Sequence, residues 1–239
     1  MSKIFIDAGH GGKDPGAVNG NVYEKDIALQ IAIKLSHVLA KSNCIATLSR
    51  FNDIFVPLID RANKANQYNA DIFVSIHLNS SANKTASGIE TLVYKNQGVN
   101  NKLATIIQNE LINSTNATNR GIKERPDLVV LNSTKMPAVL VEVGFVSNEK
   151  EKDLLIKSEY QDKIAQAIAK GILNYLGLKL VQTKNDKEVE SMTEIKDVKA
   201  AIKKLQDKGV ISSPDYWINA VNVVKYLDTL IINMANKIS

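Results

Sequence analysis

The chain has 239 residues, which is enough for one medium-sized domain or for a medium and a small one. Its composition, with 44% hydrophobic and 23% charged residues, is ordinary for a globular protein, and no apolar run is long enough to span a bilayer. The net charge of +5 is spread along the chain, so no basic run predicts nucleic-acid binding, and the single cysteine excludes an internal disulfide.

Strand and helix patterns alternate through the first 180 residues. In chain order, we expect a strand at Ile4–Ile6, a helix at Glu24–Lys41, a strand at Ile45–Arg50, a helix at Pro57–Asn69, strands at Ile72–Ile76 and Ile89–Tyr94, a helix at Asn100–Ser114, strands at Leu128–Leu131 and Ala138–Val143, and a helix at Tyr160–Leu176. Asn148, followed by Glu151, is typical of the cap that begins a short helix. Strands that are apolar on both faces and separated by helices predict an α/β fold with a mostly parallel sheet, covered on both sides.

The C-terminal part of the chain has a different pattern. Residues 181–192 are polar and predict a linker. After them, an apolar stripe predicts a helix capped by Thr193, and two further helical segments begin at Ser213 and Asn222. We therefore expect a large domain at 1–180 and, beyond the linker, a small three-helix module at 193–239, which would dock, self-associate or bind a ligand.

Four residues with reactive side chains stand where a predicted strand ends or a predicted helix begins. They are His10, Glu24, His77 and Glu142. Because ligands bind at the carboxyl ends of the strands in parallel sheets, His10, His77 and Glu142 are expected on one rim. Glu24, at the start of a helix, would be held rigidly. The third histidine, His37, lies within a predicted helix and is not a candidate.

These side chains suit the chemistry of a hydrolytic metal site. Two imidazoles and one carboxylate form a ligand set for zinc that leaves a fourth position for water. Such an ion acidifies water and polarises an amide carbonyl. A further group must then move a proton. Glu142 is the candidate, because a carboxylate in an otherwise apolar strand needs a role or a partner.

Taken singly, each of the four residues also has a structural explanation. A histidine after a strand is usually a hydrogen-bonded residue without catalytic function. Glu24 alone is explained by the preference of the helix dipole for an acid in the first turn. Glu142 could be half of a buried ion pair, for example with Arg61. The shared position on one rim favours the metal site over these separate explanations.

The candidate residues lie in sequence blocks that resemble the signatures of a known enzyme family. The blocks are Asp7–Gly12 with Glu24 downstream, Ala70–Asn79 and Pro137–Asn148. They resemble those of zinc-dependent N-acetylmuramoyl-L-alanine amidases, bacterial and phage enzymes that cut the bond between the lactyl group of muramic acid and L-alanine in peptidoglycan. The resemblance covers residues 3 to about 178, in order and at similar spacing.

The resemblance implies a twisted six-stranded sheet flanked by helices, zinc held by His10, Glu24 and His77, and Glu142 as the catalytic carboxylate. It implies peptidoglycan as the partner, in cell lysis or wall turnover, and leaves open whether the enzyme is a phage endolysin or a bacterial autolysin. For residues 193–239 the similarity is weak. It implies a cell-wall-targeting or self-association module, with a homodimer as the expected form of self-association.

The start of the chain bears on where such a protein would act. The apolar run after Met1 is short and Asp7 interrupts it, so no signal peptide is predicted. We expect synthesis in the cytoplasm, no membrane insertion, and action on the cell wall after release by lysis or through a holin. Two alternatives remain open at this point: a zinc carboxypeptidase-like peptidase, and a wall-binding regulatory protein without catalysis.

Overall fold

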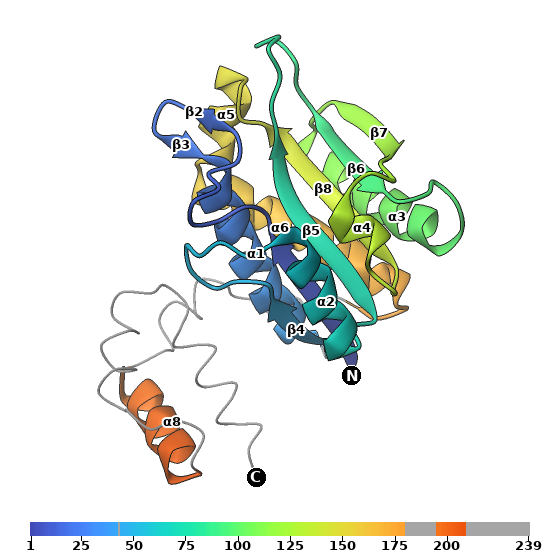
Figure 1. The fold of residues 1–239 in the computed structure, drawn as a ribbon. Coiled ribbons are helices and arrows are strands. Elements are labelled where there is room, and N and C mark those ends of the chain that lie inside the picture. The colour runs from blue at the N-terminus through green and yellow to red at the C-terminus, as the bar shows by residue number, and fades with distance from the viewer. Residues whose placement is uncertain (43, 180–194, 209–239) are drawn as a thin grey trace. The chain divides into compact units, whose positions relative to one another are not determined.

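A six-stranded sheet forms the centre of the N-terminal unit, Met1–Val181 (Figure 1). In the computed structural model, which describes residues 1–42, 44–179 and 195–208, the strands follow the order β4 (Cys44–Leu48), β1 (Ser2–Ala8), β5 (Ile72–Asn79), β8 (Ala138–Phe145), β6 (Ile89–Val93) and β7 (Asn119–Glu124). All neighbours pair in parallel except β6 and β8, which are antiparallel. The predicted α/β fold with a mostly parallel six-stranded sheet is therefore confirmed.

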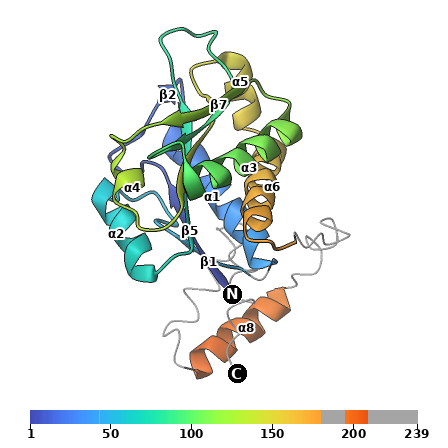
Figure 2. The same ribbon diagram turned by 90° about the vertical axis from the view of Figure 1, so that its right-hand side faces the viewer.

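Helices cover both faces of this sheet. One face carries α1 (Glu24–Ala40), α3 (Gly98–Thr115) and α6 (Ser158–Tyr175), whereas α2 (Leu58–Tyr68) and the short α4 (Val129–Asn132) lie on the other (Figure 2). A small hairpin of β2 (Val18–Asn19) and β3 (Val22–Tyr23) precedes α1, and α5 (Glu149–Leu155) follows β8. As predicted, Asn148 caps α5 by accepting hydrogen bonds from the backbone N–H groups of Lys150 and Glu151.

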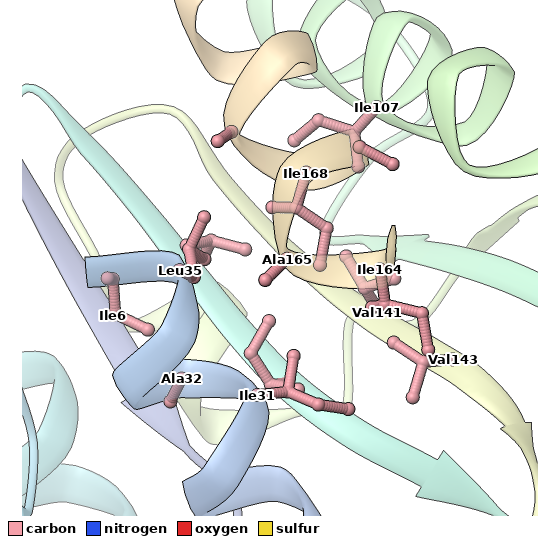
Figure 3. Close-up of a cluster of buried hydrophobic side chains, with 14 of the residues drawn as sticks. Ile6, Ile31, Ala32, Leu35, Ile107, Val141, Val143, Ile164, Ala165 and Ile168 are labelled. Carbon is pink, nitrogen blue, oxygen red and sulfur yellow. The ribbon is translucent and has the colours of Figure 1, made fainter. Parts of the chain in front are cut away.

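The larger hydrophobic core lies between the sheet and α1, α3 and α6. Figure 3 shows Ile31 and Leu35 of α1 and Ile164 and Ile168 of α6 gathered over Val141 of β8. Strand side chains alternate between the two faces, so the apolar residues at 72, 74 and 76 of β5 enter this core. The residues between them face the opposite side of the sheet. His77 and, by the same alternation in β8, Glu142 therefore lie on the face that α2 and α4 cover.

One predicted strand is wrong, because Leu128–Leu131 does not join the sheet. The chain turns after Pro126, where the N–H of Leu128 donates to the carbonyl of Arg125, and continues as α4. This single helical turn buries Val130 and Leu131 in a smaller hydrophobic cluster, on the face of the sheet opposite the larger core. A run of four apolar residues has the same hydrophobicity as a buried strand or a buried helical turn, so the pattern alone could not separate them.

The sixth strand is instead β7, which the sequence pattern did not predict. Four of its six residues are polar or charged, and these four are exposed, because the strand pairs on one side only and ends the sheet. Edge strands commonly carry charged side chains, which interrupt the apolar alternation by which strands are recognised.

The second unit comprises Gln182–Ser239. Within it, the structure describes α8 (Ile195–Asp207), which coincides with the first predicted helix and buries Ala201, Ile202 and Leu205. The predicted linker at 181–192 and the helices expected after Ser213 and Asn222 lie outside the described residues. Among the helices that are described, none combines the length and the apolar character needed to cross a bilayer.

Candidate active site

His10 lies in the loop that follows β1, in a backbone conformation that residues with a side chain seldom adopt. Its φ angle is +58°, in the left-handed region, which costs a residue with a side chain about 1–2 kcal/mol. In this position the ring nitrogen Nδ1 lies 2.9 Å from Oδ2 of Asp14, and Nε2 lies 3.1 Å from Oε1 of Glu24. The loop thus aims the Nε2 side of the imidazole at Glu24.

Glu24 is the first residue of α1 and is nearly fully buried. Its carboxylate accepts two backbone hydrogen bonds, at 2.8 Å from the N–H of Ala17 and at 2.9 Å from the N–H of Leu78. Oε1 also lies 2.9 Å from Nδ1 of His77. Both backbone donors and both imidazoles therefore favour a charged carboxylate at this point.

His77 and Glu142 are direct neighbours in the sheet. They are register partners in the parallel pair of β5 and β8, at the ends where both strands reach the rim. The rings of His77 and His10 meet edge to face, with centroids 4.8 Å apart and planes at 76°. Oε2 of Glu142 is buried and finds no hydrogen-bond partner among the described residues. The structure therefore brings all four predicted residues together, and three of them, His10, His77 and Glu142, are those that the topology led us to expect on one rim.

The close approach of His77 depends on a glycine. A Cβ atom added to Gly9 would lie 2.5–2.8 Å from three atoms of the His77 ring, closer than such atoms can approach. Only glycine at this position leaves room for the imidazole beside β1.

Mutual contacts shift the pKa values in this cluster. Burial alone would lower the pKa of His10, but its hydrogen bonds and charge interactions with Glu24 and Asp14 outweigh burial and raise the pKa to about 9. Burial opposes ionisation of Glu24 as well, yet hydrogen bonds from His10 and His77 hold its pKa well below the usual range. Burial raises the pKa of Glu142 to about 7, opposed by the charge of His77 and supported by the charges of Glu24 and Glu90.

The geometry of His10, Glu24 and His77 fits a metal ion. One ligand atom from each residue lies within 4.8 Å of the other two, and two imidazoles with one carboxylate are a known donor set of catalytic zinc. Asp14 behind His10 matches the carboxylate that usually orients a metal-bound histidine. The negative charge of Glu24, which would attract a metal cation, also stabilises a proton on His10 and so contributes to the raised pKa of this histidine.

Two carboxylates of the site were not predicted. Asp14 follows His10 by four residues in a glycine-rich loop, where only the shape of the turn reveals that the two side chains meet. Glu90 lies directly opposite Glu142 in the antiparallel pair of β6 and β8, and binds Asn79 at 2.9 Å and Arg120 at 2.8 Å. The alternation of β6 could have placed Glu90 on this face, had the antiparallel pairing been known.

The suggested ion pair between Glu142 and Arg61 does not form. Arg61 instead binds Asp7, with Nη1 at 2.8 Å from Oδ1, and both side chains are fully buried. Asp7 lies within β1, and its carboxylate balances the charge of the buried guanidinium of Arg61 beneath the rim. Among the residues that the structure describes, Glu142 therefore has no ion-pair partner that would explain it as a structural residue.

Comparisons with known proteins show what this chain is similar to. A family model described as N-acetylmuramoyl-L-alanine amidase matches residues 4–174. The endolysin of Bacillus phage SPP1 is 40% identical over 188 residues, covering 75% of this chain and 68% of the endolysin. The germination-specific N-acetylmuramoyl-L-alanine amidase of Bacillus subtilis is 34% identical over 186 residues, covering 72% and 78%. A crystal structure of an N-acetylmuramoyl-L-alanine amidase from Clostridium difficile 630 superposes with a TM-score of 0.71 at 41% identity, covering 74% of this chain and 97% of that one.

Proposed function

Since the chain belongs to the N-acetylmuramoyl-L-alanine amidase family, we propose that it cuts its substrate with zinc held by His10, Glu24 and His77 and with Glu142 as the proton carrier. The chain is a peptidoglycan hydrolase that acts on the amide bond between N-acetylmuramic acid and L-alanine. The observation that carries the zinc proposal is the convergence of two imidazoles on one buried carboxylate oxygen, at 3.1 and 2.9 Å.

The proposed roles follow from what each side chain contacts. A zinc ion held by the three ligands would supply a Lewis acid that acidifies water and polarises the amide carbonyl. Asp14 keeps the His10 ring oriented through Nδ1, and the two backbone N–H groups on Glu24 fix its carboxylate. These contacts leave the ligands little freedom, so the binding site is largely formed by the fold itself.

Glu142 is proposed to move the proton that the reaction requires. Its buried Oε2, to which no described residue is hydrogen-bonded, lies one strand away from His77 and on the same face of the sheet. It takes a proton from the attacking water, whose oxygen adds to the lactyl carbonyl carbon. It then gives that proton to the nitrogen of L-alanine as the C–N bond breaks. The products are a lactyl carboxylic acid and a free amino terminus on the stem peptide.

The test is a comparison of Glu142→Gln with Glu90→Gln. Each variant neutralises one carboxylate, and the two carboxylates face each other across the pair of β6 and β8 on the same face of the sheet. They differ in their contacts, because Glu90 is already bound to Asn79 and Arg120. We expect Glu142→Gln to keep its zinc and to lose roughly 10²- to 10⁴-fold in amide cleavage, the usual contribution of a general acid–base. We expect a far smaller loss for Glu90→Gln. Turnover by Glu142→Gln at the wild-type rate would refute the assigned role.

The remaining residues are proposed to serve delivery to the wall. The family match ends at residue 174, so residues 193–239 lie outside the catalytic domain that we assign to 1–180. We propose that they form a module that binds the cell wall or joins two copies of the chain, with 181–192 as the linker. The amphipathic α8, which buries one side around Ile202 and Leu205, supports either role. Release by lysis or through a holin stays a prediction. Measuring whether the protein is found outside intact cells would test it.

A further inference from the structure

We propose that Arg50 and Arg61 are positioning residues, which hold the backbone of the metal-ligand segments in place before any metal binds. This inference rests on the proposed metal-dependent function and adds to it a reason for two buried guanidinium groups beneath the site. Both side chains are 1% exposed and belong to the largest fully buried side chains of the described chain. Neither touches the reacting atoms, so their effect must pass through the residues that they bind.

Arg61 fixes the loop of His10 directly. Its Nη2 donates to the carbonyl oxygen of His10 at 2.7 Å, and its Nη1 donates to that of Ala8 at 2.7 Å. Nε donates to the carbonyl of Val56 at 2.9 Å, which anchors the guanidinium at the start of α2. The backbone of the ligand is thus tied at two points, on the residue itself and two residues before it.

Arg50 joins two ligand segments to each other. Its hydrogen bonds reach the carbonyl oxygens of Ala8, Asn52, Gly9 and Lys25 at 3.1, 3.1, 2.7 and 2.7 Å. The last two come from the same nitrogen, Nη2. Gly9 precedes His10 and Lys25 follows Glu24, so one atom bridges the neighbours of two proposed ligands.

The segment of the third proposed ligand, His77, is linked to Arg61 through Asp7. Its Oδ1 binds Arg61 at 2.8 Å and its Oδ2 accepts a hydrogen bond of 2.7 Å from the hydroxyl of Ser75. Ser75 lies in β5, two residues before His77 and on the same face. The buried network of two arginines, Asp7 and Ser75 therefore reaches every segment that carries a proposed ligand.

The left-handed conformation of His10 explains why arginine is needed. A loop that leaves regular geometry turns several carbonyl groups inward, and each buried carbonyl needs a donor. A guanidinium offers five N–H donors in a rigid planar fork, whereas the ammonium of lysine offers three from a single point. Lysine at position 50 or 61 would therefore keep the positive charge but could not bridge the same carbonyls.

The experiment measures zinc affinity of the full-length protein by competition with a chelator, for wild type, Arg50→Lys and Arg61→Lys. We expect each variant to bind zinc about 10- to 100-fold more weakly, as is typical when residues behind metal ligands are changed. Leu111→Ala serves as the control, because Leu111 is fully buried in α3 and belongs to the core on the opposite side of the sheet. It should lower thermal stability and leave zinc affinity unchanged.

The outcomes separate this inference from the proposed function. If wild type binds zinc and both arginine variants match it, the positioning role is overturned and the metal site stands. If Leu111→Ala weakens zinc binding as much at an equal loss of thermal stability, the effect is general destabilisation and the role is again overturned. A wild type that binds no zinc would overturn both proposals. Should an arginine variant fail to fold, Ser75→Ala, which removes one hydroxyl, is expected to show a smaller loss of affinity, and wild-type affinity in it would count against the network.

Discussion

Replacing Gly9 by alanine should disable the site while leaving the fold almost intact. The added Cβ would lie 2.5, 2.6 and 2.8 Å from Cε1, Nε2 and Nδ1 of His77. Ordinary contact between such atoms is about 3.5–4.0 Å, so the ring must withdraw by about 1 Å. Metal-ligand distances tolerate only about 0.2 Å, and a misplacement of about 1 Å near reacting atoms can cost 10²-fold in rate. We therefore expect Gly9→Ala to lose zinc and at least roughly 10²-fold in turnover.

The assay counts amino groups released from purified peptidoglycan, together with the zinc content of the purified variant. Gly171→Ala is the matched control, since its Cβ would lie 2.8 Å from Cα and Cγ1 of Ile107, in the packing of α3 against α6. Overpacking there should lower the free energy of unfolding by about 1–3 kcal/mol without changing turnover per folded molecule. Wild-type zinc content and turnover in Gly9→Ala would refute the reasoning that His77 has no room to move.

Three further predictions concern charge, pH and domain structure. Asp7→Asn should leave the charge of Arg61 buried without its partner, and lower the free energy of unfolding in urea by about 3–5 kcal/mol; an unchanged unfolding midpoint would contradict this. Because the pKa of His10 is about 9 without metal, zinc must displace its proton, so zinc affinity should fall about tenfold for each pH unit below 9; affinity independent of pH would contradict a protonated His10. A fragment of residues 1–181 should cleave a soluble muramyl peptide like the full chain but sediment less with intact walls, and equal sedimentation would exclude a wall-binding role for residues 182–239.

The sheet and its helices could be predicted because their residues repeat with clear periods. The apolar residues of α1 recur with helical spacing, and the apolar run of β5 is rich in β-branched residues, so each pattern favours one assignment. Where the period is lost, prediction failed: β7 is charged because it lies at the edge, and the run at Leu128–Leu131 is too short to distinguish strand from helix. In both cases the deciding factor is a neighbour in space, which the local sequence does not contain.

The same distinction applies to the site. His10, Glu24, His77 and Glu142 could be predicted, since each stands at a strand or helix end and the topology brings such ends together. The residues that hold them could not be predicted. Arg50 binds main-chain carbonyl oxygens, which every residue possesses and which no sequence pattern marks.

Product analysis with and without metal tests the central claim most directly. Purified peptidoglycan would be digested by the untreated protein, by protein stripped with a chelator, and by stripped protein restored with zinc. We predict new amino-terminal alanine, with no new reducing sugar ends and no free carboxy-terminal amino acids, and expect this product to vanish on stripping and to return with zinc. Undiminished release of amino-terminal alanine after complete removal of metal would contradict the assignment of His10, Glu24 and His77 as zinc ligands.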